Sequence, residues 1–131
     1  MKKYSSAFVL ILVFLATGCK ESKEKTFGRI AREMTAKCPR AINEFTRLDS
    51  VVYLPGGNVN RYYYTLTGDA DDALSIEANR KVMEAALTGE VANSMDLKEY
   101  KENNVTIEYI YYSDKDKKIL FQQKITPAEY K

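Results

Sequence analysis

The feature that most limits what this chain can fold into is an unbroken apolar run close to its N-terminus. Residues 7–16 read AFVLILVFLA, and Lys2 and Lys3 precede them. Crossing a bilayer as a helix takes about 20 residues, so this run is too short for a permanent transmembrane segment. A basic start followed by a short apolar core is typical of an export signal. We therefore expect residues 1–18 to be removed on export, which leaves folding to the remaining 113 residues.

The residues that follow the apolar run indicate how the exported chain is held. Leu15, Ala16, Thr17 and Gly18 lead into Cys19. This segment resembles the lipobox of bacterial lipoproteins, although that family prefers leucine where this chain has Ala16. The resemblance implies that the Cys19 thiol receives a diacylglycerol, that the signal is cut before it, and that fatty acids such as palmitate anchor the protein. Two or more acyl chains are enough for stable membrane anchoring. The alternative is a plain secretory signal that ends in cysteine.

A short polar stretch separates Cys19 from the first apolar pattern of the mature chain. Residues 20–25 read KESKEK, so we interpret residues 19–25 as a lipidated cysteine with a tether and residues 26–131 as a single domain. Extended, six residues reach about 20 Å. In lipoproteins of bacteria with an outer membrane, aspartate directly after the cysteine resembles an inner-membrane retention signal, and Lys20 stands there instead. The sequence therefore favours the outer membrane, on its periplasmic or surface side.

Charge and cysteine content exclude some partners and linkages. The net charge of +2 comes from Lys2 and Lys3, because the chain after the signal has 18 basic and 18 acidic residues. A neutral domain has no broad positive field for phosphates, so nucleic acid is not an expected partner. If Cys19 is lipidated, Cys38 has no intrachain disulfide partner and is either a buried apolar residue or a free thiol.

Apolar residues at spacings of three and four predict the helices. One stripe covers residues 27–45, with Thr26 as its expected N-cap. Pro39 lies inside this stripe and predicts a kink or a break there, because a mid-helix proline removes a hydrogen bond. A rougher stripe covers residues 74–91, and a shorter helix is expected at residues 95–102.

Strand-forming segments predict two hairpins. Residues 48–54 and 61–67 form the first pair around the turn cluster PGGN, and residues 105–112 and 119–126 form the second. The simplest arrangement is α+β, a four-stranded antiparallel sheet from two β-hairpins, each preceded by helix in the order α-β-β-α-β-β, with the helices on one face.

The chain contains no residue pattern that specifies a reaction or a metal. There is no histidine, which removes serine–histidine and cysteine–histidine nucleophiles and the commonest transition-metal ligand. An EF-hand starting at Asp69 would need a ligand at position 73 and glycine at position 74, where Ala73 and Leu74 stand. We therefore expect no catalytic residues, no metal site and no cofactor.

The tyrosines are the feature most indicative of binding. Nine of the ten lie after the signal, and Tyr63 and Tyr112 are expected on the sheet face away from the helices. Exposed aromatic rings with a polar tip suit contacts with a protein or glycan. Tyrosine is also a favoured strand residue, so cross-strand stabilisation is the alternative role. Arg47, beside Asp49, either binds a partner or forms an ion pair that fixes the start of the strand.

The mature chain also resembles a group of small uncharacterised bacterial envelope lipoproteins. The shared residues are Cys38 and Pro39, residues 46–51 (TRLDSV), residues 62–66 (YYYTL) and residues 104–106 (NVT). No activity is attached to that group, so the resemblance implies only a similar fold. We interpret the chain as a lipid-anchored, non-enzymatic envelope protein that binds a protein or glycan through a tyrosine-rich sheet face. The alternatives are a small envelope enzyme with unrecognised acid/base residues and a pilot-type lipoprotein that escorts an outer-membrane assembly.

Overall fold

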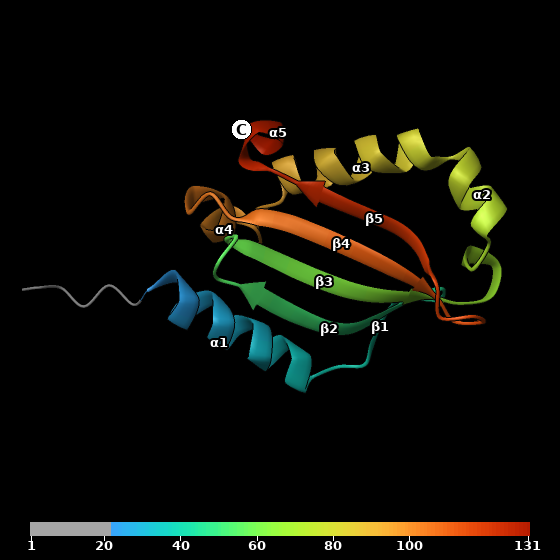
Figure 1. Cartoon of the computed structure of the whole chain (residues 1–131), viewed down its shortest axis with the longest axis horizontal. Coiled ribbons are helices and arrows are strands. Elements are labelled where there is room, and N and C mark those ends of the chain that lie inside the picture. The colour runs from blue at the N-terminus through green and yellow to red at the C-terminus, as the bar shows by residue number, and fades with distance from the viewer. Residues whose placement is uncertain (1–21) are drawn as a thin grey trace, which may run out of the picture.

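A five-stranded mixed sheet organises the computed structural model, which describes residues 22–131 (Figure 1). The strands, in their order across the sheet, are β1 Arg40–Asn43, β2 Thr46–Leu54, β3 Val59–Leu66, β4 Thr106–Ser113 and β5 Ile119–Ile125. The helices are α1 Lys23–Ala36, α2 Ala73–Ala78, α3 Arg80–Asn93, α4 Lys98–Glu102 and α5 Pro127–Tyr130, with a 3-10 turn η1 Gly68–Ala70 before α2. The predicted α+β class is confirmed, whereas the export signal and Cys19 lie outside the described residues.

The first helix begins earlier than the sequence indicated. Ser22, not Thr26, caps α1, and its hydroxyl accepts a hydrogen bond from the backbone N–H of Lys25. The last three residues of the expected tether are therefore helical. Phe27 and Ala31, four residues apart on one face of α1, are almost fully buried against the sheet.

The second half of the predicted first helix is a strand, which is a correction. The chain leaves α1 at Lys37, and the residue before a proline avoids the helical region, so Pro39 ends the helix instead of kinking it. Residues 40–43 then form β1, and the side chain of Asn43 accepts from the backbone N–H of Phe45 in the tight turn to β2. Ile42 of the expected helical stripe is 47% exposed on this edge strand.

The pairing of the two hairpins is the second correction. Four antiparallel strands were expected, but β3 and β4 run parallel in the middle of a five-stranded sheet. A parallel neighbour requires a crossover connection. Here α2, α3 and α4 form it, and the 14 residues of α3 extend about 21 Å, which returns the chain along the sheet. β4 therefore begins at the same end of the sheet as β3.

The helical segments between β3 and β4 divide at points that side chains explain. Asp72 caps α2 by accepting from the backbone N–H groups of Leu74 and Ser75, both at 3.1 Å. Asn79 separates α2 from α3, so the expected single helix is two. Pro127, expected only to end β5, also starts α5. No described helix is long and apolar enough to span a membrane.

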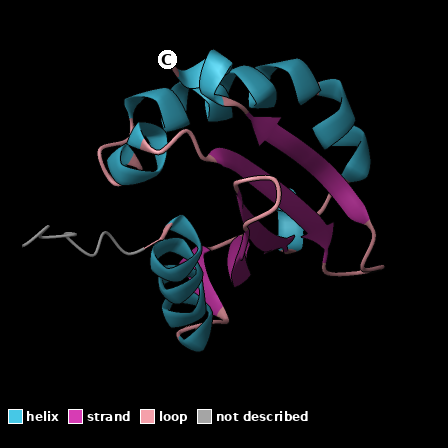
Figure 2. Cartoon of the chain, turned by 60° about the vertical axis from the view of Figure 1, so that its left-hand side comes forward, coloured by secondary structure: helices cyan, strands magenta, loops and turns pink. Residues whose placement is uncertain are grey.

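All the principal helices pack on one face of the sheet, as expected. α1 lies along β2, and α3 lies along β5 (Figures 1 and 2). Phe27 of α1, Val91 of α3 and Ile107 of β4 belong to the same buried cluster, and each is at most 1% exposed. The hydrophobic core therefore lies between this face of the sheet and the helices.

Tyrosines from β3 and β4 form a ladder on the helix-covered face. Tyr62 and Tyr109 are cross-strand neighbours with ring centroids 5.3 Å apart, and Tyr64 and Tyr111 follow at 4.9 Å. Burial raises the pKa values of all four, to about 12 for Tyr111. Burial likewise raises the pKa of Tyr100 in α4 to about 12. These phenols are neutral at physiological pH.

We expect alkali to unfold the domain, because these tyrosines keep their protons in the folded state to a higher pH than in the unfolded chain. Unfolded tyrosine ionises near pH 10, so the stabilisation is complete below that pH and is lost as the pH rises toward 12 and above. Each such tyrosine lowers the free energy of unfolding by about 1.4 kcal/mol per pH unit in that interval. Urea titrations at pH 9, 10, 11 and 11.5 measure this. Tyr109→Phe should make the fall shallower, and an equal slope in the variant would contradict the prediction.

Candidate functional site: the uncovered face of the sheet

The sheet face opposite the principal helices is the candidate site, and we call it the outer face. Cross-strand register defines its central rows. One row is Val52, Arg61, Glu108 and Lys124; the next is Ser50, Tyr63, Ile110 and Gln122; a third is Arg47, Thr65, Tyr112 and Ile119. The predicted residues Arg47, Tyr63 and Tyr112 thus lie on one face, in two adjacent rows.

A buried carboxylate fixes the middle of the outer face. The side chain of Glu108 is fully buried on β4, and the Arg61 guanidinium on β3 donates to its Oε1 atom. Lys124 on β5 lies on the other side, with its Nζ atom 3.7 Å from Oε2. A buried charge is tolerated only when it is paired. Arg61 is therefore held in one position over the sheet.

Arg61 in turn orients the first of the two predicted tyrosines. Its Nη1 atom donates to the Tyr63 hydroxyl at 3.2 Å, and its guanidinium carbon lies 6.0 Å from the centroid of the Tyr63 ring. The hydrogen bonds to Tyr63 and Glu108 raise the pKa of Arg61 above its ordinary value, so it stays charged. The buried Glu108 carboxylate and the half-buried Tyr63 ring are thus connected through Arg61.

Tyr63 and Tyr112 stack on each other across β3 and β4. Their ring centroids are 6.3 Å apart with an interplanar angle of 21°. Ile110, 5% exposed, pairs directly with Tyr63 and lies two residues from Tyr112 on the same strand. Both rings are half-buried, so each keeps part of its surface in solvent. The pair is a fixed aromatic feature on a face that carries both polar and apolar side chains.

Arg47 lies at one side of the outer face and forms a local ion pair. Its Nε atom donates to Oδ1 of Asp49 at 2.7 Å, and the Thr65 hydroxyl donates to Oδ2 at 2.6 Å. The hydrogen bond to Asp49 raises the pKa of Arg47. A β-bulge between Leu48 and Ser50 turns Asp49 to this face. Arg47 thus fixes the start of β2, one of the two roles considered for it, and its part in binding stays a prediction.

The concave site closest to the tyrosine ladder contains no activated group. A pocket of about 220 Å³ between α3 and the sheet is lined by Tyr64, Tyr109 and Tyr111 together with Glu90. Burial raises the pKa values of the three phenols, which makes them poorer acids and poor nucleophiles at neutral pH. Among residues 22–131 no three histidine, cysteine or acidic side chains cluster as metal ligands. The half-buried thiol of Cys38 donates to the Met34 carbonyl at 3.3 Å.

Sequence reasoning missed Arg61 and Glu108, although a signal was present. Glu108 lies inside VTIEYIYY, a segment of strand formers whose middle residues are buried in a central strand. An acid at such a position requires a cationic partner on a neighbouring strand. Arg61, the one basic residue of β3, is that partner. The pairing itself could not be found, because it depends on the parallel register of β3 and β4.

The sequence of the folded part identifies its family. Residues 22–121 match the family model described as a domain of unknown function, DUF8479. The chain belongs to this family. The match starts at Ser22, the N-cap of α1, and ends within β5. No curated protein matches the chain.

Two solved structures share the fold. A Pseudomonas aeruginosa protein that is presumed to be secreted is similar at 16% identity with a TM-score of 0.71, and the match covers 82% of this chain and 92% of that one. The pilotin of the Vibrio vulnificus type 2 secretion system, EpsS, is similar at 8% identity with a TM-score of 0.61, and the match covers 82% and 91%. At these identities the similarity establishes the α+β fold alone.

We expect the effects of mutating Arg61 and Glu108 on the free energy of unfolding to be strongly non-additive. Arg61→Met leaves the Glu108 carboxylate buried with only Lys124 near it, so the free energy of unfolding should fall by about 3–5 kcal/mol. The double variant Arg61→Met with Glu108→Leu removes both charges and should recover most of that loss. Urea denaturation at pH 7 measures both. A single variant as stable as the wild type would show that the pair does not organise this face.

Proposed function

We propose that this protein is a lipid-anchored, non-enzymatic envelope protein that binds another protein through the outer face. The observation that carries the proposal is the stacked Tyr63–Tyr112 pair, which Arg61 orients on a face that the principal helices leave uncovered. Tyrosine and arginine are enriched where proteins bind each other, and a preformed arrangement lowers the entropy lost on binding. Arg47, in the row of Tyr112, is the proposed polar contact at the side of this surface.

Anchoring through Cys19 is the part of the proposal that the sequence supports. The basic residues, the short apolar run and the lipobox-like segment precede the part of the chain that the structure describes, which begins with Ser22. In this proposal residues 1–18 are the signal, Cys19 carries the lipid with a short tether, and the remaining chain is one domain on the outer membrane. Lys20 after the cysteine supports the outer over the inner membrane.

The arrangement of the rings favours a protein over a glycan as the partner. The two ring planes are inclined by only 21° and stack on each other, so each ring uses part of one face within the pair. A sugar stacks on an open aromatic face, whereas a protein side chain also packs against ring edges. Val52, 38% exposed in the row beside that of Tyr63, and Ile119, 51% exposed in the row of Tyr112, extend the apolar surface on either side.

A pilot-type role is the second candidate, and the fold shared with a secretion pilotin favours it. A pilot-type lipoprotein escorts an outer-membrane assembly, which requires a lipid anchor and a partner-binding surface on one small domain. The main proposal also includes a lipid anchor and a partner-binding surface, so the two candidate functions differ only in the identity of the partner. If an outer-membrane oligomer fails to reach the membrane in cells that lack this protein, the result would support the pilot role.

The anchor has a direct test in the mature protein. We expect mass spectrometry of the protein from its own membranes to find an N-terminus at Cys19 with attached fatty acids. Cys19→Ala should release the domain from the membrane fraction, because the lipid is its proposed means of attachment. A native product that begins at Met1, or that has an unmodified thiol at Cys19, would overturn the anchoring.

The binding surface is tested by affinity capture of the lipidated protein from native membranes. We expect Tyr63→Ala with Tyr112→Ala to fold and to lose a captured protein by at least tenfold, because it removes the aromatic pair. Leu74→Ala with Met95→Ala is the matched control, since both side chains are large, apolar and more than 75% exposed outside the outer face. Equal capture by all three proteins would remove the outer face as the binding surface.

A further inference from the structure

A neighbouring strand covers β2 over only its first residues. β1 pairs with β2 at Thr46, Arg47 and Leu48. Residues 50–54 of β2 pair with β3 on one side and form the edge of the sheet on the other. An uncovered edge presents backbone N–H and C=O groups that an added strand can bind.

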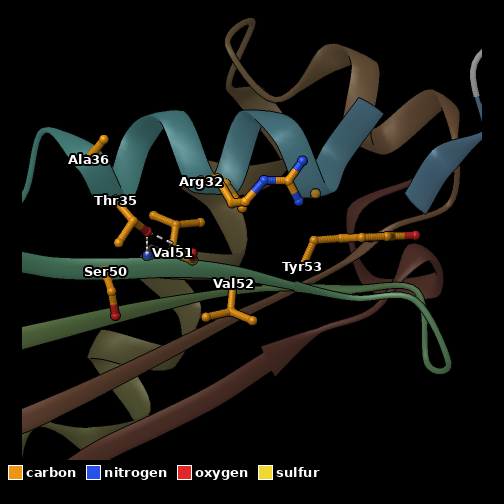
Figure 3. Close-up of a pocket in the computed structure, with 9 residues that line it drawn as sticks. Arg32, Thr35, Ala36, Ser50, Val51, Val52 and Tyr53 are labelled. Carbon is orange, nitrogen blue, oxygen red and sulfur yellow. Dashed lines mark hydrogen bonds between the residues drawn. The ribbon is translucent and has the colours of Figure 1, made fainter. Parts of the chain in front are cut away.

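One residue of this edge is already occupied by a side chain. The backbone N–H of Val51 donates to Oγ1 of Thr35, and the Thr35 hydroxyl donates to the Val51 carbonyl, both at 2.9 Å (Figure 3). In antiparallel pairing both backbone groups of a residue point to the same side, and the side alternates along the strand. Tyr53, two residues further on, therefore directs its N–H and C=O to the same edge. Within residues 22–131 no side chain meets those two groups.

A pocket of about 530 Å³ lies along this edge, between α1 and β2. Its α1 side includes Ala31 and Ala36, whose small side chains leave room beside the strand, and Gly28, against which the Arg32 guanidinium lies. Figure 3 shows Thr35 and Val51 linked between helix and strand, with Ser50 and Val52 on the other side of the strand. The space thus lies beside β2 next to Tyr53, which is 8% exposed.

The pocket has one charged lining residue, Arg32. Its side chain extends from α1 above β2 toward Tyr53 (Figure 3). Its helix neighbour Glu33 pairs with Arg29, and the described chain provides no ion pair for Arg32. Unpaired positive charge beside an apolar groove favours a segment that brings a carboxylate.

We propose that residues 50–54 together with the facing side of α1 are a strand-docking site for an extended, acidic segment of another protein. The segment pairs with the Tyr53 backbone, places apolar side chains in the pocket and sets a carboxylate against Arg32. This site goes beyond the proposed outer-face function and does not require Tyr63 or Tyr112. A strand added here would also extend the outer face at Val52.

A second copy of this chain does not fit the site. Asp49 and Glu108 are the acidic residues of the five described strands, and each is already bound, Asp49 to Arg47 and Thr65, and Glu108 to Arg61. The occupant is therefore a different protein.

Thr35 limits how much backbone the site exposes. Because its hydroxyl occupies both groups of Val51, an added strand has two free hydrogen-bonding groups at Tyr53 and gains two more only if Thr35 rotates away. Thr35→Val removes the hydroxyl while it keeps the shape of the side chain. The variant should be less stable, because it loses two hydrogen bonds, and should bind an added strand more tightly.

The test uses the lipidated full chain in detergent micelles and a synthetic octapeptide that alternates valine and threonine and has one central aspartate. We expect binding with a dissociation constant below 1 mM and slower hydrogen exchange at the Tyr53 amide. Arg32→Glu should weaken binding at least tenfold and should favour the peptide with lysine in place of aspartate. Lys81→Glu on α3 is the control for the same charge change and should bind as the wild type does.

Backbone pairing is tested with a peptide that is N-methylated at every residue, which has no backbone N–H to donate on either edge and should not bind. Thr35→Val should tighten binding of the unmodified peptide several-fold. The Tyr63→Ala, Tyr112→Ala variant should bind it unchanged, so failure of the outer face and failure of this site are distinguishable. The proposal is overturned if the octapeptide does not bind the wild type, if N-methylation or Arg32→Glu has no effect, or if a helical peptide of the same composition binds in its place.

Discussion

The parallel pairing of β3 and β4 is the constraint on which the rest of the structure depends. It places Tyr62 beside Tyr109 on the covered face and Arg61 beside Glu108 on the outer face. A shift of β4 by one residue would move Tyr109 and Glu108 each to the opposite face, while Tyr62 and Arg61 on β3 would stay in place. Tyr109 would then lie on the outer face and the Glu108 carboxylate in the apolar core. The crossover through α2, α3 and α4 therefore determines both the core and the candidate binding surface.

Local patterns were sufficient for much of the fold. The alternation in residues 105–112 and the turn cluster at 55–58 located strands β2 to β5 to within a few residues, because these signals depend on neighbours in sequence. They also put Tyr63 and Tyr112 on the face opposite the helices. β1 was missed because its four residues are all exposed and have no alternation. Pro39, interpreted as a kink, in fact separates a helix from that strand.

Long-range pairing was not accessible to the same reasoning. Whether two hairpins join through antiparallel or parallel strands depends on where the connecting helices return the chain, and the apolar stripe of residues 74–91 did not determine this. The ion pair of Arg61 and Glu108 follows from that register, and so does the support it gives Tyr63. The binding roles of Tyr63, Tyr112 and Arg47 remain proposals that rest on this geometry.

The early start of α1 has a consequence for the choice of partner. Lys23 comes four positions after Cys19, a span of at most about 14 Å, and the 14 residues of α1 add about 21 Å. Under the proposed anchoring, the β2 edge alongside α1 lies within about 35 Å of the headgroups. A segment tethered to the same leaflet by about ten extended residues reaches it. Tethering of this kind raises effective concentration into the millimolar range, so weak pairing at a short edge is sufficient for a membrane-bound partner and insufficient for a freely diffusing one.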